Sequence, residues 1–405
     1  MQTTISNKFL TNPHIEDAES ILRSCVHCGF CTATCPTYQL LGDELDGPRG
    51  RIYLIKQVLE GNEISSRTQN HLDRCLTCRS CESTCPSGVR YGRLVEIGRE
   101  IVDQQVPRNL LQSIARKLLR IIVPHPQRFA RVYKLGLLLR PILPVTMKRK
   151  MPLPQPSENP TVIAKTRKML VLQGCVQSVV TPQTNQAATR ILLKLDIELI
   201  TAPKAGCCGA VSHHLSAPEE GLDFMRRNID AWWPYIEQGA EAIVVTASGC
   251  GAVVKDYAHL LKHDTVYADK AKRVSTLAKD ISEVLHQENL SAVTTKQSAS
   301  KVAFHSPCTL QHGQKITGVV EQILQNSGFT LTHVEDAHLC CGSAGTYSIL
   351  QPKLSQQLLD NKLSALQSEQ PDLIATGNIG CQMHMASKAQ VPVKHWLELI
   401  DENLV

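Results

Sequence analysis

Hydrophobic and polar positions follow a helical period in the first quarter of the chain. In residues 92–106, for example, Leu94, Ile97 and Ile101 recur at the spacing that places side chains on one face of a helix. The same spacing predicts helices over residues 13–23 and after the turn Gly47-Pro48-Arg49-Gly50, while residues 1–12 are polar and are expected to fray. This part of the chain is therefore predicted to be built from helices.

From residue 168 onward, short apolar runs alternate with helical patterns, and the whole order occurs twice. Strands joined by helices form parallel sheets, and the loops at the carboxyl ends of those strands converge at one edge. Each copy is thus expected to be an α/β module with a parallel sheet. The predicted strands are residues 168–174, 197–201 and 242–247, then 301–305, 329–334 and 372–376; the predicted helices are 184–195, 219–237, 318–327 and 353–368.

Length and patterning together predict an α+β multidomain protein. A chain of 405 residues exceeds one ordinary domain, and its 42% of hydrophobic residues suffices for several cores. The predicted division is 1–105, a helical domain; 106–167, basic amphipathic helices and a proline-rich linker; 168–295, the first module; and 296–405, the second module. We find no apolar run of membrane-spanning length and no signal-like segment in residues 1–20, so we expect a cytoplasmic protein, peripheral on the inner membrane.

The net positive charge of the chain is concentrated in residues 104–157. Apolar and basic residues interleave there at helical spacing, and prolines divide the stretch into short amphipathic pieces. Three arrangements fit: a hairpin that packs on its own chain, a helix in the interface of an anionic membrane, and a face for an acidic partner. Nucleic acid is disfavoured because no recognition motif accompanies the charge. Residues 151–167, rich in proline, are expected to be extended. The stretch has no Asp or Glu and eleven basic residues, in a chain of net charge +6: Arg108, Arg116, Lys117, Arg120, Arg128, Arg131, Lys134, Arg140, Lys148, Arg149 and Lys150.

Two runs of the pattern C-x2-C-x2-C-x3-C-P carry the clearest chemistry. Thiolates at i, i+3 and i+6 in a tight loop reach three corners of a 4Fe-4S cubane, and in two-cluster ferredoxins the fourth cysteine of each run ligates the other cluster. Two zinc sites are the alternative, but zinc needs only C-x2-C pairs and not two full runs with a trailing proline. We expect one cluster on Cys25, Cys28, Cys31 and Cys85 and a second on Cys75, Cys78, Cys81 and Cys35.

The other eight cysteines form two copies of one set: Cys175, Cys207, Cys208 and Cys250, then Cys308, Cys340, Cys341 and Cys381. Three are displaced by 133 residues and the last by 131, so the modules are an internal duplication. In a reducing compartment they serve as ligands rather than disulfides, and four thiols suit a further iron-sulfur cluster or zinc. A pseudo-twofold pairing would bring both sets to one interface. Of the nearby histidines, His305 and His338 are candidates for supporting the ligands.

These motifs resemble a known family over essentially the whole chain. The likeness is carried by the two cysteine runs, the intervening GDELDGPRGRIYLIKQVLEG, and the segments NIDAWWP, ASGCGA and HLCCGSAGTY. The chain resembles the iron-sulfur subunits of bacterial glycolate oxidase (glycolate dehydrogenase), with an alpha-helical ferredoxin domain at its N-terminus. Its modules resemble the cysteine-rich CCG modules of heterodisulfide reductase and of glycerol-3-phosphate and lactate dehydrogenase subunits. One departure is that the C-x2-C that often ends those modules has Ala247 or Asn378 in place of its first cysteine.

The resemblance implies an electron-transfer role with no catalytic residue on this chain. In that family glycolate is oxidised to glyoxylate on FAD-binding partner subunits, and the iron-sulfur subunit passes electrons towards a quinone or other membrane acceptor. The absence of G-x-G-x-x-G after a strand and of G-x4-G-K-[ST] agrees with a flavin on another polypeptide. Two alternatives stay open: a subunit of a related glycerol-3-phosphate or lactate dehydrogenase, or a protein like heterodisulfide reductase with catalysis at the CCG modules.

Overall fold

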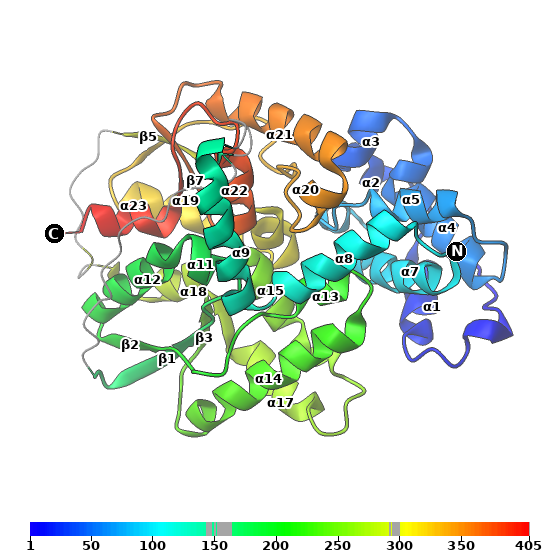
Figure 1. Cartoon of the computed structure of the whole chain (residues 1–405), viewed down its shortest axis with the longest axis horizontal. Helices are drawn as coiled ribbons and strands as arrows, with labels where there is room; N and C mark the ends of the chain where they lie inside the picture. The colour runs from blue at the N-terminus through cyan, green and yellow to red at the C-terminus, as the bar shows by residue number, and fades with distance from the viewer. Residues whose placement is uncertain (143–147, 150, 152–163, 291–292, 294–299, 405) are drawn as a thin grey trace.

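A computed structural model describes residues 1–142, 148–149, 151, 164–290, 293 and 300–404 (Figure 1). It contains a helical N-terminal domain and two α/β modules, each with a four-stranded parallel sheet. The predicted fold class, an α+β multidomain protein with duplicated parallel-sheet modules, is confirmed. The linker expected over residues 151–167 lies mostly outside the described residues.

The N-terminal domain packs its helices around one apolar core. Helix α4 starts at Pro48, whose missing N–H costs nothing in a first turn, and it buries Ile52, Ile55 and Leu59 against α7. The prediction that residues 1–12 fray is wrong, because the Met1 amino group donates to the carbonyl oxygens that end α1 and Phe9 is buried. The elements are η1 (Asn7–Phe9), α1 (Ile15–Ser24), α2 (Phe30–Ala33), α3 (Pro36–Leu41), η2 (Glu44–Asp46), α4 (Pro48–Leu59), α5 (Ser66–Asp73), α6 (Ser80–Ser83) and α7 (Tyr91–Gln105).

The first module orders its strands β2-β1-β3-β4. Its middle strands are buried apolar runs, as parallel strands covered by helices on both faces must be. The elements are β1 (Arg167–Val171), α11 (Gln177–Val180), α12 (Pro182–Lys194), β2 (Ile197–Ile200), α13 (Ala210–His214), α14 (Pro218–Glu237), β3 (Ile243–Val245), α15 (Ser248–Lys255), α16 (Tyr257–Leu260), α17 (Ala268–Leu277), β4 (Ala278–Asp280) and α18 (Ile281–Gln287).

The second module repeats this order as β6-β5-β7-β8. The predicted strand over residues 329–334 shortens to two residues, while the other predicted strands and helices occur within a few residues of their expected ends. The elements are β5 (Lys301–His305), η5 (Thr309–Gly313, a π-helical turn), α19 (Val319–Asn326), β6 (Thr330–Leu331), α20 (Tyr347–Leu350), α21 (Pro352–Gln367), β7 (Leu373–Thr376), α22 (Ile379–Ala386), β8 (Val393–His395) and α23 (Trp396–Glu402).

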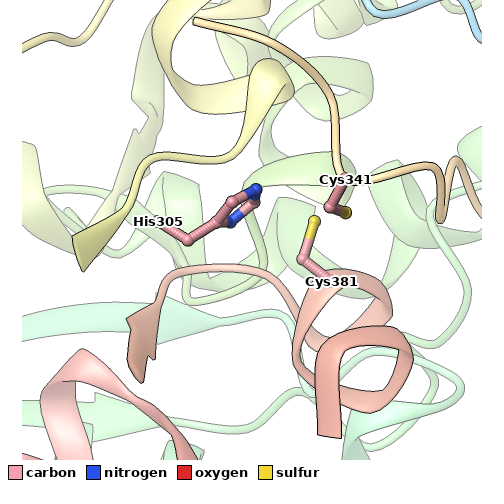
Figure 2. A group of neighbouring side chains, drawn as sticks. All are labelled: His305, Cys341 and Cys381. Atoms are coloured by element: carbon pink, nitrogen blue, oxygen red, sulfur yellow. The ribbon is translucent and has the colours of Figure 1, made fainter. Parts of the chain in front are cut away.

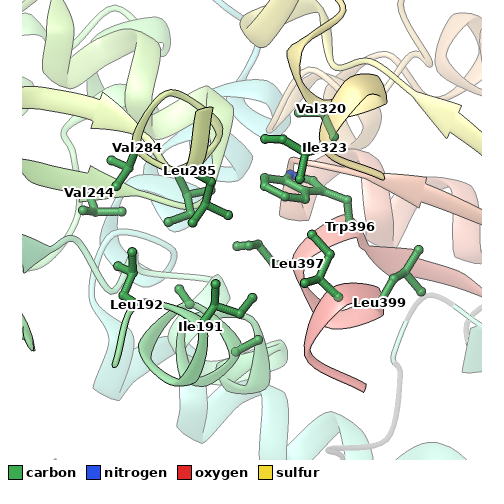
Figure 3. Packing of buried hydrophobic residues seen from close by; sticks show 14 of the residues in the cluster. Ile191, Leu192, Val244, Val284, Leu285, Val320, Ile323, Trp396, Leu397 and Leu399 are labelled. Carbon is green, nitrogen blue, oxygen red and sulfur yellow. The ribbon is translucent and has the colours of Figure 1, made fainter. Parts of the chain in front are cut away.

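The two modules share one hydrophobic core. Ile191 and Leu285 of the first module lie in the same buried cluster as Ile323, Trp396 and Leu397 of the second (Figure 3). Ion pairs reinforce the contact, since α12 holds α23 through Arg190 and Asp401. The two modules therefore form a single packed unit and are not two independent domains joined by a linker.

The basic stretch forms two helices and a short turn: α8 (Leu110–Ile122), α9 (Pro126–Leu139) and η3 (Arg140–Ile142). Helix α9 packs on its own chain, with Tyr133 buried beside Val180, Ala247 and Ile379 where the two modules meet. Helix α8 crosses from the N-terminal domain towards the modules (Figure 1). Of the three arrangements that fit the basic stretch, α9 therefore adopts packing on its own chain.

Candidate iron-sulfur and metal centres

Both cysteine runs fold into the same loop. In the first run His27 and Gly29 have positive φ values of 56° and 87°, and in the second Thr77 and Arg79 have 53° and 62°. Two left-handed residues, each next to the middle cysteine, curl the backbone so that successive thiols turn to one side. A short helix then carries the third cysteine, and a proline comes directly after the fourth. The arrangement suits three thiolates around one cluster.

The structure brings the thiols together in crossed sets. Cys25 and Cys31 of the first run lie close enough to Cys85 of the second for its charge to act on them. Helices α2 and α6 pack against each other, which closes this site. The first set lines a cavity of about 30 Å³. Conversely, Cys35 is among the groups whose charge acts on Cys78 and Cys81.

The two sets differ in their electrostatic surroundings. Burial raises the pKa of the Cys31 thiol to about 11. Burial would also raise the pKa of Cys75, but the guanidinium groups of Arg51 and Arg99 outweigh it and lower that pKa. The Tyr91 hydroxyl and the Thr77 N–H both point at the Cys75 sulfur, at 3.5 Å and 3.3 Å. Negative charge is therefore stabilised at Cys75, whereas burial raises the pKa of Cys78 and Cys81 well above its usual value.

Arg51 is the buried cation of this domain, with 1% of its side chain exposed. It donates to the carbonyl oxygen of His71 at 2.7 Å and to Thr37 Oγ1 at 3.2 Å. The fully buried carboxylate of Asp46 faces it and also binds Arg74 at 2.7 Å. These contacts fix the guanidinium beside Cys35 and Cys75, and sequence patterns gave no sign of it because its partners come from three separate helices.

In the first CCG module the four thiols form a connected row. Cys175 contacts Cys207, Cys207 contacts Cys208, and Cys208 contacts Cys250. These hydrogen bonds hold the pKa of Cys207 well below its usual value. Asn228 of α14 bonds the backbone on both sides of Cys207, and so holds the Cys-Cys-Gly turn in place.

The second CCG module repeats the row and adjoins the N-terminal domain. Cys308 and Cys340 have their sulfurs 3.9 Å apart, and the row continues through Cys341 to Cys381. Cys78 of the N-terminal domain lies in the same apolar cluster as Cys308 and Cys340. Helix α21 of this module packs beside α3 (Figure 1). The thiols predicted for two separate domains thus lie side by side.

His305 and His338, the two candidate histidines, have different positions. His305 ends β5 and points at Cys341 and Cys381 (Figure 2). The His338 backbone carbonyl accepts a hydrogen bond of 2.9 Å from His312 Nε2, and the His338 side chain is not part of the His305 group. Only His305 is placed as a ligand.

The last cysteine of each module faces the other module. The Asn378 side chain accepts from the Gly249 N–H at 3.3 Å and donates to Cys381 Sγ at 3.3 Å. Ser248 Oγ lies 2.8 Å from Thr309 Oγ1 across the same contact. The expected face-to-face pairing of the modules is therefore present, and Asn378, at the position of the missing cysteine, bridges it.

A cleft separates α7 from the first module. It comprises adjoining cavities of about 70 and 50 Å³, lined by Cys78, Glu96 and His213 among others. Glu96 accepts from His213 Nε2 at 3.4 Å and lies 3.1 Å from His214 Nδ1. An acid and two imidazoles thus link the N-terminal domain to α13, beside the second set of thiols.

Three arginines, two of them on helix α8 and one just before it, turn inward, whereas Lys117 of α8 is exposed. Arg108 and Arg116 bind Asp73 at 2.6 and 3.0 Å, and Arg120 lies 3.5 Å from Glu220. The apolar stripe of α8 faces outward, and Leu111 is 80% exposed. The exposed apolar residues of α8, α9 and η3 are Leu110, Leu111, Ile114, Leu118, Ile121, Val132, Leu135, Leu138, Leu139 and Ile142, and we call them the outer apolar face.

Comparison with known proteins agrees with this arrangement. Residues 169–255 and 302–386 match the cysteine-rich domain family CCG, and residues 21–89 match the 4Fe-4S dicluster domain. The chain is 56% identical over 405 residues to the glycolate oxidase iron-sulfur subunit of Escherichia coli, covering 100% of this chain and 99% of that protein. It is 31% identical over 401 residues to the probable glycolate oxidase iron-sulfur subunit of Bacillus subtilis, covering 91% and 89%.

More distant relatives share part of the chain or the fold. Lactate utilization protein A of Bacillus licheniformis is 23% identical over 226 residues, which cover 55% of this chain and 91% of that protein. A crystal structure of a hypothetical protein from Helicobacter pylori has the same fold, with a TM-score of 0.56 at 10% identity over 97% of this chain and 72% of that one. The 56% identity to the Escherichia coli protein extends over the whole chain and includes both the dicluster region and the CCG modules. The chain therefore belongs to the family of glycolate oxidase iron-sulfur subunits.

Proposed function

We propose that this chain is the electron-transfer subunit of a flavin-dependent glycolate oxidase. By its family it is an oxidoreductase subunit, an iron-sulfur subunit of a hydroxyacid oxidase, and its relatives are named for glycolate and lactate. Oxidation of glycolate to glyoxylate removes two electrons and two protons. We assign that step to FAD on partner subunits, because the sequence has neither of the common nucleotide-binding glycine motifs.

Residues 1–105 hold two 4Fe-4S clusters in this proposal. The match to a 4Fe-4S dicluster domain and the closeness of Cys85 to Cys25 and of Cys35 to Cys78 support the crossed assignment. When bound, such clusters accept and release single electrons with little rearrangement of their ligands. Residues 106–167, 168–295 and 296–405 remain the proposed further divisions. The ligands are Cys25, Cys28, Cys31 and Cys85 for one cluster and Cys75, Cys78, Cys81 and Cys35 for the other.

The observation that carries the proposal is the contact between Cys78 and the second module. Cys78 and Cys308 lie in one apolar cluster with Cys340, so the second set of ligands continues directly into the row of module thiols. Electron transfer needs a short path through a dry environment, and the contact between Cys78 and Cys308 is both close and apolar. We therefore assign the exit route to the second module.

The entry side is the loop of the first run. Val26 and Phe30 flank Cys28 there, and 67% and 61% of these apolar side chains are exposed. Exposed apolar residues around a redox site are typical of a docking surface for a partner protein. We assign this loop to the FAD-binding subunits.

The acceptor side lies at the membrane in this proposal. None of the described helices is both long and apolar enough to span a bilayer. The outer apolar face, flanked by exposed Lys117, Arg128, Arg131 and Lys134, suits the interface of an anionic membrane, where a quinone is available. Arg116 and Arg120, which belong to the same basic stretch, instead bind acids of this chain.

The test uses the purified complex with its FAD-binding subunits. Replacing Cys308 and Cys340 by Ser should leave flavin reduction by glycolate intact in stopped-flow traces, while steady-state turnover with a quinone falls at least about tenfold. Cys175→Ser, at the equivalent position in the first module, is the matched control and should leave both rates unchanged. Loss of flavin reduction in an assembled complex would mean that the modules take part in the chemistry, as in heterodisulfide reductase. If lactate or glycerol 3-phosphate reduced the flavin and glycolate did not, glycolate would not be the substrate.

A further inference from the structure

The second module contains a buried imidazole with a free nitrogen. His305 is 2% exposed, and its Nδ1 lies 3.0 Å from Thr376 Oγ1. Its Nε2 has no hydrogen-bond partner among the described residues. Leaving a buried polar atom without a partner is unfavourable, so such an atom suits a ligand.

Two thiols occupy the space in front of this nitrogen. The ligand atoms of His305, Cys341 and Cys381 all lie within 4.8 Å of one another, and all three residues are buried (Figure 2). In a tetrahedral zinc site with bonds of about 2.0 and 2.3 Å, ligand atoms are separated by about 3.5–3.8 Å. Three ligands already this close need only a small movement to share one ion. Thiolates on different corners of a cubane lie farther apart.

The surroundings complete a metal site. Thr376 holds the imidazole by Nδ1 and so leaves Nε2 for the ion, and Asn378 Nδ2 donates to Cys381 Sγ at 3.3 Å. Lys362, a buried cation of α21, lies near Cys341 and donates to the Asp336 carbonyl oxygen at 2.8 Å. It would offset the negative charge that the module's thiolates bring into the core.

The first module cannot form this site. Leu172 stands 133 residues before His305, the displacement that relates the cysteines. Asn228 stands 134 residues before Lys362, the displacement between the first residues of α14 and α21. Neither supplies a nitrogen ligand or a buried cation, so the duplicated modules differ in chemistry.

We propose that His305 Nε2, Cys341 Sγ and Cys381 Sγ bind a single zinc ion in the second module. The site uses two thiolates and one imidazole, a ligand set that zinc favours, and three protein ligands leave a fourth position open. Cys308 and Cys340 stay outside it, facing Cys78. The inference does not depend on glycolate as the substrate.

The test measures metal in the full-length chain purified anaerobically. We expect about one zinc per chain by elemental analysis, in addition to the cluster iron, and a zinc X-ray absorption spectrum with two sulfur neighbours. His305→Ala should lose at least about four-fifths of the zinc, and His305→Cys should retain it. Cys250→Ser, in the first module, is the matched control and should keep full zinc. Circular dichroism and the iron content of each variant show whether it is folded.

Three results would overturn the site: no zinc in the native chain, zinc unchanged in folded His305→Ala, or an equal loss in Cys250→Ser. Loss of iron and sulfide together in His305→Ala would mean a cluster and would also overturn the single ion. Because iron content and flavin reduction in the complex are measured separately, failure of this site and failure of the electron-transfer proposal give different results.

Discussion

Tyr91 places its hydroxyl against the sulfur of Cys75, at 3.5 Å in a fully buried setting. A donor to a ligand sulfur stabilises the reduced, more negative cluster more than the oxidised one, so it raises the reduction potential. The guanidinium groups of Arg51 and Arg99 act on the same sulfur. These three groups are therefore expected to raise the potential of the second cluster.

Tyr91→Phe keeps the ring and removes the donor. The potential of the second cluster should fall by roughly 40 mV, the equivalent of about 1 kcal/mol for one electron. Redox titration monitored by electron paramagnetic resonance measures both clusters at once, so the first cluster is the internal control. Tyr53→Phe, an exposed tyrosine on α4, is the matched variant and should change neither value. A shift of the first cluster alone would contradict the assignment.

Cys35→Ser tests the crossed ligands. The fourth thiol of the first run lies with Cys78 and Cys81, so its loss should remove or alter the signal of the second cluster and leave the first. Paramagnetic resonance of the reduced full-length variant makes this comparison, with Cys85→Ser as the reciprocal case. If Cys35→Ser instead damages the cluster of Cys25, Cys28 and Cys31, the ligands are not crossed.

Among single residues, the candidate ligand cysteines could be predicted from their spacing in the sequence. The residues that surround and support these cysteines could not. Arg99 reaches the Cys75 carbonyl oxygen from a helix that passes the loop only after folding. Lys362 did leave a signal, because it interrupts the apolar stripe of Leu358, Leu359, Leu363 and Leu366 on α21. A charged residue inside such a stripe is a candidate for a buried functional group.

Among the elements, helix α8 is amphipathic with its apolar side facing outward, the reverse of a usual surface helix. Its arginines, Arg116 and Arg120, bind acids of the chain, while Leu110, Leu111 and Leu118 are exposed. Hydrophobic patterning predicted the helix and left its orientation open, because the same apolar stripe can face the core, a membrane or a partner. Asp73, which fixes the orientation, lies on α5, far away in sequence.

Leu111→Gln with Leu118→Gln should weaken binding to membranes. The two substitutions remove exposed apolar side chains, so flotation of the complex with phosphatidylglycerol vesicles should drop by about tenfold or more while the fold is kept. Val266→Gln with Ile349→Gln removes apolar residues that are similarly exposed elsewhere and should have no effect. If the α8 variant floats normally but loses its FAD-binding subunits, the outer apolar face is a subunit interface.

The sequence patterns missed one edge strand in each sheet. β4 and β8, three residues each, complete the sheets by pairing with β3 and β7. Their sequences, AKD and VKH, contain no apolar run and so gave no strand signal. Tertiary pairing, and not local pattern, makes them strands.

On the scale of the whole molecule, the N-terminal domain is held to the first module by charge. Burial alone would raise the pKa of Glu96, but its hydrogen bonds to His213 and His214 hold it well below the usual value. Burial would lower the pKa of His213, but Glu96 raises it above 6.5. The His213 contribution to stability is complete below pH 6.5 and is lost as the pH rises through the folded pKa; that of Glu96 is lost on acidification below 4.5.

The substitution Glu96→Gln should therefore lower the stability most between pH 4.5 and the folded pKa of His213. We expect the free energy of unfolding to fall by about 1 kcal/mol near pH 6 and by clearly less near pH 9, where His213 is neutral in both proteins. Thermal unfolding of the full-length chain in the two buffers gives the difference. Glu100→Gln, one turn further along α7, is the matched control. An equal loss at both pH values would show that the pair contributes through packing alone.

The amide of Asn378 touches both modules at once, accepting from Gly249 and donating to Cys381. Hydrogen bonds that share one amide polarise each other, so a more negative sulfur at Cys381 strengthens the bond to Gly249, next to Cys250. Such a coupling would be reciprocal: a ligand bound by the thiols of the first module would change the affinity of the second module for its proposed zinc ion, and that ion would change the affinity for the ligand by the same factor. The duplicated modules would then be a cooperative pair, with the side chain of Asn378 carrying the coupling between them.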